Sequence, residues 1–449
     1  MIALRADLLD FTAAPAWGEP TMHGVRWRPD HWLCIDPAGG GGGGGGGGPA
    51  AGRIVDVRPG HEDPGPGWRR LDHRGRLVLP GFVDTHVHSA QLEVIGSFGS
   101  ALLDWLERYT FPAEQAWRDP ERARQGATRF LDALLAHGTT AAVVFPTVHK
   151  VGAEALFEAA AARGMRLVCG KVLMDRHAPE GLRDDVTQAE RDCIELIERF
   201  HGRGRNAYAL TVRFAPTSTP GQLAMAGALC AADASLYMQT HVAENRDEVR
   251  WVAELFPDAR SYLDVYARAG LLHPRSVLAH GIWLDADDRA LLAERGAQVA
   301  FCPSSNLFLG SGLCDWKALR DAGVAVSVAS DVGGGTSLNL LRTLADGYKV
   351  QALAGQRLNA WVALHAATAG AAQSLGLAGE IGRLEPGLMA DFCVWNWTAG
   401  VVDDIRLGRA GDLHEKVFAW MTLADDRHLA SSWVAGRCLH QGHEGRDGA

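Results

Sequence analysis

An alternation between short apolar runs and segments with helical periodicity is the feature that most constrains the fold of this 449-residue chain. The apolar runs span residues 82–88, 140–145, 166–173, 208–214, 236–241, 277–280, 298–302 and 324–331. Segments with apolar residues at helical spacing lie at 120–137, 153–163, 189–200, 220–231, 247–255 and 285–295. Eight strands that alternate with helices predict a parallel (β/α)₈ TIM-like barrel. Two further helices are expected at 338–354 and 359–375.

The two ends of the chain contain short β-like segments instead, at 25–27, 54–57, 391–395 and 432–439. They predict a small β-sandwich domain, composed of residues 1–75 and 384–449, beside a barrel of residues 76–383. An unbroken glycine run from Gly39 to Gly48 is expected to be a flexible loop, because glycine has no side chain to pack. Pro49 and Ala50 follow this run, whereas a P-loop requires Gly-Lys-Ser/Thr.

Composition excludes several classes of protein. Apolar residues make up 47% of the chain and charged residues 22%, as in ordinary globular proteins. The net charge of -9 argues against nucleic acid as a partner. No apolar stretch approaches the ~18 residues of a membrane span, and Asp7 interrupts any signal-peptide pattern. The 8 cysteines form no Cys-x-x-Cys pair, so we expect reduced thiols in a cytoplasmic protein without membrane partners.

Metal-binding side chains end four of the predicted strands. The first strand ends in His86 and His88, whose imidazoles point to one side because side chains alternate along a strand. The fifth, sixth and eighth strands end in His241, His280 and Asp331. A barrel carries its chemistry at the carboxyl ends of its strands, so these side chains are expected to meet there. A nitrogen-rich set with one carboxylate suits Zn²⁺ or Fe²⁺ better than Mg²⁺ or Ca²⁺.

The spacing of these residues predicts metal-assisted hydrolysis. A bound metal ion lowers the pKa of water from ~15.7 toward ~7, and Glu244, three residues after His241, is placed to move the proton. His280 is either a fifth ligand or a hydrogen-bond partner of the water and the substrate, and we favour the second role. The alternative is a set of core histidines with no metal.

A binuclear site with a carbamylated lysine is a further alternative. Lys171 is the only lysine in a strand-like run, but it lies in the third run, and the fourth ends in Arg213 and Phe214. We therefore expect one metal ion.

Several longer motifs accompany these residues. They are PGFVDTHVH at 80–88, LLDWL at 102–106, YTFPAE at 109–114, TVHK at 147–150, KVLMD at 171–175, RFAPTS at 213–218, NLFLGSG at 306–312 and DVGGGTS at 331–337. With these motifs, most of the chain from Leu77 onward resembles the amidohydrolase superfamily and, more closely, its guanine deaminase family. The resemblance implies hydrolytic deamination of guanine to xanthine and ammonia, a reaction of purine catabolism or salvage.

The resemblance also implies roles for individual residues. One Zn²⁺ per subunit, or Fe²⁺, would be held by His86, His88, His241 and Asp331. Glu244 would be the proton shuttle, with His280 and Asp331 as further catalytic groups. Guanine would contact Gln91, Arg213, Phe214, His241 and Glu244. An amide, a guanidinium and an aromatic ring suit a flat, neutral heterocycle. The resemblance further implies a homodimer.

Three positions depart from the family pattern, namely Ser89, Ala90 and Ser330, and they affect the shape of the pocket rather than the chemistry. A related deaminase or chlorohydrolase that acts on another aminopurine, a pterin or a triazine is the alternative enzyme. A non-catalytic scaffold or metal-binding module is the alternative outside enzymes, but such a protein would be expected to have lost ligands that are all present here.

Overall fold

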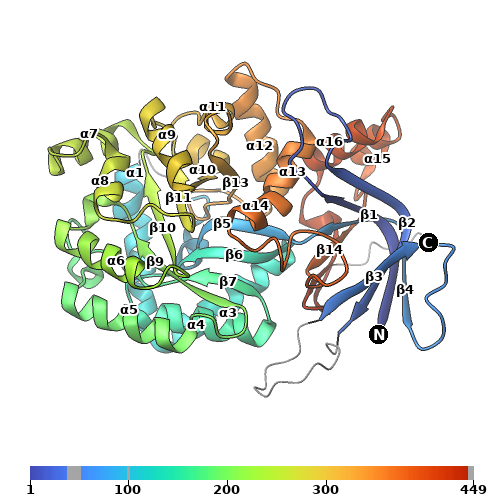
Figure 1. Cartoon of the computed structure of the whole chain (residues 1–449), viewed down its shortest axis with the longest axis horizontal. Helices are drawn as coiled ribbons and strands as arrows, with labels where there is room; N and C mark the ends of the chain where they lie inside the picture. Colours follow the sequence, from blue (N-terminus) through green and yellow to red (C-terminus); the bar gives the residue numbers. More distant parts are fainter. Residues whose placement is uncertain (38–51, 99–101, 443–449) are drawn as a thin grey trace.

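The computed structural model describes residues 1–37, 52–98 and 102–442, which form a barrel with a smaller β-rich part beside it (Figure 1). The predicted loop from Gly39 to Gly48 lies outside the described residues. Among the described residues, no helix is both long enough and apolar enough to span a membrane.

Eight parallel strands form the barrel wall and are hydrogen-bonded to one another in sequence order. They are β5 (Phe82–His88), β6 (Thr139–Phe145), β7 (Arg166–Cys169), β9 (Asn206–Val212), β10 (Tyr237–Val242), β11 (Ser276–His280), β12 (Gln298–Phe301) and β13 (Ala325–Val328). Each strand falls on one of the predicted runs, so the (β/α)₈ barrel is confirmed. The third run is interrupted at Gly170, where a Cβ would come within 1.9 Å of the Ala209 carbonyl oxygen, and resumes as the short strand β8 (Val172–Leu173).

Helices follow the strands and surround the barrel (Figure 1). They include α3 (Pro120–Ala136), α4 (Lys150–Arg163), α5 (Val186–Phe200), α6 (Pro220–Ala232), α7 (Arg246–Leu255), α8 (Tyr262–Arg268), α9 (Ala286–Arg295), α10 (Pro303–Phe308), α11 (Trp316–Asp321) and α12 (Leu340–Leu353). Local signals set their ends. The Asp119 side chain accepts a hydrogen bond from the Arg122 backbone at the start of α3, and Gly164 ends α4 with φ of 69°.

The segment predicted as one helix at 359–375 forms two, α13 (Ala360–Ala366) and α14 (Ala369–Ser374). The backbone N–H of Val83 on β5 donates to the carbonyl of Ala367 at 2.9 Å. That tertiary hydrogen bond takes the carbonyl that a continuous helix would use, so the helix breaks between α13 and α14.

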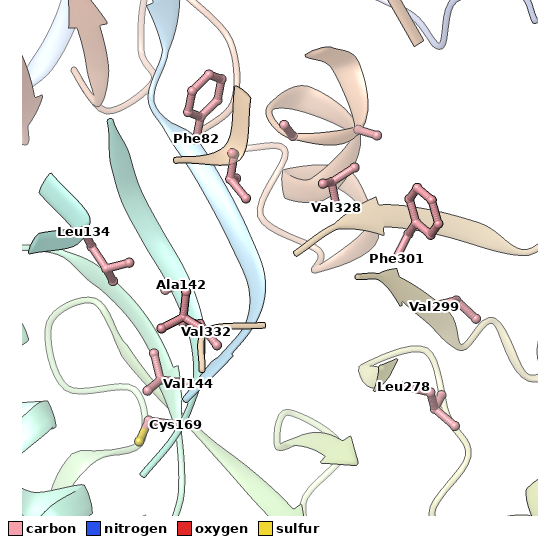
Figure 2. Packing of buried hydrophobic residues seen from close by; sticks show 14 of the residues in the cluster. Phe82, Leu134, Ala142, Val144, Cys169, Leu278, Val299, Phe301, Val328 and Val332 are labelled. Carbon is pink, nitrogen blue, oxygen red and sulfur yellow. The ribbon is translucent and has the colours of Figure 1, made fainter. Parts of the chain in front are cut away.

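Two hydrophobic clusters divide the residues of the barrel strands. On β6, Ala142 and Val144 face outward and pack in one cluster with Leu134 of α3 (Figure 2). Ala141 and Val143 alternate with them and belong to the cluster inside the barrel, which also contains Ala371, Ala372 and Leu375 of the α14 region. Tyr237, the first residue of β10, donates a hydrogen bond to the Leu375 carbonyl at 2.6 Å. The α14 region therefore closes the amino-terminal end of the barrel.

The smaller part of the structure is one seven-stranded sheet with the order β16-β15-β14-β4-β1-β2-β3. Its strands are β1 (Ile2–Phe11), β2 (Val25–Asp36), β3 (Arg53–Pro59), β4 (Arg69–Pro80), β14 (Phe392–Trp395), β15 (Leu429–Val434) and β16 (Arg437–Gln441). All neighbours pair antiparallel except β1 and β4. The sheet folds over so that Arg53 of β3 bridges to Met389 beside β14, with Leu4, Leu33 and Phe392 buried inside. The two layers of the predicted sandwich thus belong to one continuous sheet.

The expected boundary between the two parts falls within a strand. β4 keeps its pairing in the small sheet beyond residue 75, up to Pro80, which lies opposite Phe392. On the other side of the barrel segment, Leu384 donates a backbone hydrogen bond to the Asp10 carboxylate at 2.7 Å. Two helices, α15 (Val401–Leu407) and α16 (Leu413–Leu423), also lie in the carboxyl-terminal segment. The division at 75/76 and 383/384 stays a prediction.

Candidate active site

The closure of the barrel brings the first and last candidate ligands together. His88 N donates to the Val332 carbonyl at 2.8 Å, and Asp331 N donates to the His86 carbonyl at 2.9 Å. The segment that follows β13 therefore continues the wall beside β5. Residues that lie far apart in the sequence meet at the carboxyl edge of the barrel.

Four side-chain atoms converge there, and four of the six distances between them are nearly equal. His88 Nε2 lies 3.2 Å from His86 Nε2 and 3.2 Å from His241 Nε2. Asp331 Oδ1 lies 3.2 Å from His86 Nε2 and 3.3 Å from His88 Nε2. Four ligands at about 2.0 Å from a tetrahedral ion lie roughly 3.3 Å apart, so the geometry and the nitrogen-rich donor set both fit Zn²⁺.

His280 lies beside this group at longer distances. The ligand atoms of His86, His241, His280 and Asp331 all lie within 4.8 Å of one another, so His280 can also contribute to a metal site. However, its Nε2 is 3.8 Å from Asp331 Oδ2 and 3.5 Å from Glu244 Oε2. His88 therefore fits the tetrahedral set better, and His280 lies on the side of Glu244.

The protonation states of this cluster are those that a metal requires. Burial lowers the pKa of His86 and holds that of His88 at about 3. Burial, followed by the neighbouring imidazoles, holds the pKa of His241 well below its usual value. Burial opposes ionisation of Asp331, but hydrogen bonds from His86 and His88 outweigh it and hold its pKa well below the ordinary range. Neutral imidazoles and an ionised carboxylate are the forms that bind metal.

Partners behind the cluster orient its members. His241 Nδ1 lies 2.6 Å from the Arg213 carbonyl, which favours the tautomer with a free Nε2. Asp84, fully buried, accepts hydrogen bonds from His86 N at 3.3 Å, from Ser330 N at 3.0 Å and from the Ser330 hydroxyl. Burial raises the pKa of Asp84 to about 7. The sequence analysis did not identify Asp84, although it lies two residues before His86.

Three site positions have left-handed backbone conformations that non-glycine residues seldom adopt. These are Ala243, with φ of 48°, His280, with φ of 72°, and Asp331, with φ of 48°. All three lie where a barrel strand ends and a loop begins. Such conformations persist only where surrounding contacts impose them, and they gather at functional sites.

Glu244 is buried next to the ligand cluster. Its Oε1 accepts a hydrogen bond from the Ser311 hydroxyl at 2.9 Å. Burial raises the pKa of Glu244, although the charge of His280 opposes the shift. The loop that carries it is anchored by Glu248, whose Oε2 accepts from Glu244 N at 3.0 Å and from Asn245 N at 3.1 Å. The sequence analysis did not identify Glu248, which the Asn-x-x-Glu capping box at 245–248 could have indicated.

A pocket lies next to these groups. Its lining contains His88, Gln91, Trp105, Leu106, Arg213, Phe214, His241, Glu244, Glu248, His280, Leu309, Asp331 and Gly334. The structure therefore brings the five predicted purine-binding residues into one cavity with the candidate ligands His88 and Asp331, namely Gln91, Arg213, Phe214, His241 and Glu244. Their roles stay predictions.

Glu114 is an additional buried acid behind this lining. Its two carboxylate oxygens each accept from Arg213 Nη1 at 2.8 Å, and Oε1 also accepts from Gln91 Nε2 at 2.9 Å. The sequence analysis included Glu114 only as part of the motif at 109–114 and gave it no role. Its isolated position, far from both partners in the sequence, offered no spacing signal.

Lys171, the residue considered for a bridged pair of metals, has a different environment. Its buried Nζ donates to Asp184 Oδ1 at 2.7 Å, and Lys171 is not among the residues that line the pocket. The described side chains therefore favour a single ion.

A comparison with known protein families matches residues 77–439 to the Amidohydrolase family. The chain belongs to the amidohydrolase family. It is 45% identical to the guanine deaminase of Escherichia coli (strain K12) over 373 residues, which are 83% of this chain and 85% of that protein. The resemblance to the guanine deaminase family is thus confirmed.

Solved structures of this family also have the same fold. A structure of E. coli guanine deaminase matches with a TM-score of 0.91 and 40% identity, over 98% of this chain and 100% of that one. Guanine deaminase from Bradyrhizobium japonicum matches with a TM-score of 0.90 and 30% identity, over 98% and 99% of the two chains.

Proposed function

We propose that this protein hydrolyses guanine to xanthine and ammonia. One observation carries the proposal: a single pocket is lined by three of the four candidate metal ligands, namely His88, His241 and Asp331, and also by a buried acid, an amide, a guanidinium and an aromatic ring. Membership in a family whose sequenced relatives include a guanine deaminase at 45% identity supports it.

We propose one Zn²⁺ per chain, held by His86, His88, His241 and Asp331, with Fe²⁺ as the alternative ion. When bound, the ion acts as a Lewis acid that makes water a nucleophile near neutral pH. The separations of 3.2–3.3 Å between the ligand atoms support this assignment.

Purine binding is assigned to Gln91, Arg213 and Phe214, which line the pocket together with His241 and Glu244. The bonds to Glu114 use only Nη1 of Arg213, which leaves Nη2 and Nε to donate to the carbonyl oxygen or a ring nitrogen of guanine. Gln91 adds an amide donor, and Phe214 packs on the purine ring. This orientation directs C2 toward the ligand cluster.

Proton movement is assigned to Glu244. In its ionised form it takes a proton from the attacking water and delivers it to N3 of the purine, while Asp331 Oδ2 orients that water. His280 Nε2, which is buried and has no hydrogen-bond partner among the described residues, is available to bind the oxygen added at C2. The remaining proton of the added water then passes from the oxygen at C2 through Glu244 to the 2-amino nitrogen. The C2–N bond breaks and the amino group leaves as ammonia, so that guanine and water give xanthine and ammonia.

A substrate panel tests the proposal. Purified protein with a measured zinc and iron content is assayed for ammonia release from guanine, adenine, cytosine and melamine, and for xanthine formation from guanine. We expect guanine to be turned over with the highest kcat/KM. Faster release of ammonia from adenine or melamine would instead assign the protein to the alternative activity on another aminopurine or a triazine.

The setting of the enzyme is also a proposal. We propose a cytoplasmic homodimer in purine catabolism or salvage, without nucleic-acid partners. All eight cysteines are free thiols, as expected in a reducing compartment, and the net charge is -9. Light scattering on the purified protein measures the mass, and a monomer at micromolar concentration would contradict the homodimer.

A further inference from the structure

A short helix supplies two groups that hold the Arg213 guanidinium. The helix α2 (Phe111–Gln115) carries Glu114, whose side chain is fully buried and ion-paired with Arg213 Nη1 at 2.8 Å. Phe111 of the same helix presents its ring to the guanidinium carbon at a centroid distance of 5.4 Å. One element therefore sets both the charge environment and the orientation of Arg213.

The same carboxylate fixes the Gln91 amide. Glu114 Oε1 accepts from Gln91 Nε2 at 2.9 Å, and Gln91 Oε1 accepts from the backbone N–H of Gly333 at 3.2 Å. A flipped amide would place its oxygen against a carboxylate and its nitrogen against an N–H, so only one orientation is favourable. Glu114 thus determines which end of the Gln91 amide faces the bound purine.

The charge balance of this side of the pocket depends on Glu114. Among the described residues, Glu114 is the only carboxylate that is ion-paired with Arg213. Besides Arg213, the titratable groups that line the pocket belong to the metal and proton-transfer side. They are His88, His241, Glu244, Glu248, His280 and Asp331. Without Glu114, the guanidinium would keep an uncompensated charge in a buried site, where Coulomb interactions are strong.

We propose that Glu114 is a positioning residue that selects for a neutral purine by cancelling the charge of Arg213, and that it thereby weakens binding of the anionic form of the product. The inference rests on the proposed function. Glu114 does not line the pocket and acts through Arg213 and Gln91.

The product is the ligand that this arrangement disfavours. Replacement of the 2-amino group by an oxo group makes a ring N–H of xanthine more acidic than that of guanine, so a larger fraction of xanthine is anionic as the pH rises. A compensated guanidinium gains little from that negative charge, whereas an uncompensated one gains much more. The charge pair therefore favours release of xanthine.

The test is Glu114→Gln, which keeps an acceptor for Gln91 and removes the charge. The inhibition constant of xanthine and the kcat and KM of guanine are measured at pH 6.5 and pH 8.5. We expect xanthine to inhibit the variant about tenfold more strongly than the wild type at pH 8.5, with a smaller difference at pH 6.5. Glu93→Gln is the matched control, because Glu93 pairs with Arg122 at 2.7 Å and both side chains are 50% exposed.

Further measurements separate the possible outcomes. Zinc content and the melting temperature of each variant show whether the site is intact. The Glu114→Asp variant keeps the charge. It should therefore show wild-type inhibition by xanthine even if its KM for guanine changes. Unchanged or weaker inhibition of a folded, zinc-loaded Glu114→Gln variant at both pH values would overturn the inference. Failure of the wild type to deaminate guanine would overturn the proposed function instead, and xanthine affinity measured by calorimetry still tests the charge pair.

Discussion

The Ser311 hydroxyl donates a hydrogen bond to Oε1 of Glu244 at 2.9 Å, which fixes one oxygen of the carboxylate to which we assign the proton transfer. The other oxygen, Oε2, lies 3.5 Å from Nε2 of His280. Ser311 comes from the loop after α10, so the proton-transfer group is held by an element other than the one that carries it.

Replacement of Ser311 by alanine should raise the pKa of Glu244, because the hydrogen bond stabilises the ionised carboxylate. A general base is active in its ionised form. As the pH falls, the variant should therefore lose activity at a higher pH than the wild type does. We expect the acidic limb of kcat/KM to move to higher pH and kcat/KM at pH 7 to fall about tenfold. A pH profile with an unchanged acidic limb would show that Ser311 only packs against Glu244.

Replacement of Glu244 by glutamine removes the base while keeping the size of the side chain. We expect kcat to fall by about 10²–10⁴-fold, the usual contribution of a general base, while zinc content stays at the wild-type value. Steady-state kinetics and metal analysis of the same preparation measure both. Full activity of this variant would assign the proton transfer to another group.

The distances around His88 and His280 predict different effects of their removal. His88→Ala should lose most of the bound zinc, whereas His280→Gln should retain it and lose activity. His88 Nε2 lies 3.2–3.3 Å from the ligand atoms of His86, His241 and Asp331, whereas His280 Nε2 lies 3.8 Å from Asp331 Oδ2. Chelation of the wild type should abolish activity and lower Tm, and added Zn²⁺ should restore both. Zinc loss from His280→Gln comparable to that from His88→Ala would make His280 a ligand.

An ion-pair network connects the base of the barrel to the small sheet. Arg205 Nη2 donates to Asp391 Oδ2 at 2.6 Å and Arg205 Nε donates to Glu380 Oε1 at 2.7 Å, with Asp391 only 2% exposed. Arg205→Met should therefore lower the free energy of unfolding by about 3–5 kcal/mol, since it leaves the buried Asp391 without an ion-pair partner, while Glu380 keeps its ion pair with Arg166. Urea unfolding measures the loss. Arg203→Met, at an exposed position in the same loop, is the control and should change stability by less than about 0.5 kcal/mol.

The barrel could be predicted from the sequence because its signals are local. A short apolar run identified β5, and the alternation of side chains along a strand placed His86 and His88 on one side. The rule that chemistry lies at the carboxyl ends of strands linked them to His241 and Asp331. The structure brings these side chains together, as expected. The break between α13 and α14 could not be predicted, because it results from a hydrogen bond to Val83, far away in the sequence.

Residues that act through tertiary contacts were the ones missed. Glu114 and Asp84 are buried acids that accept hydrogen bonds from residues far away in the sequence. The sequence alone does not show whether a carboxylate is solvated or buried. Only the fold distinguishes a buried, hydrogen-bonded acid from one on the surface. The pairing of Lys171 with Asp184 was hidden for the same reason.

The α14 region closes the amino-terminal end of the barrel, and this closure affects how small molecules enter and leave. Within the described chain, the interior below the active site is filled by Ala371, Ala372 and Leu375, and Tyr237 is hydrogen-bonded to this segment. A purine must then arrive and depart by the same opening above the strands. A xanthine molecule that stays bound there blocks the entry of the next guanine, so the dissociation of xanthine can limit the turnover rate.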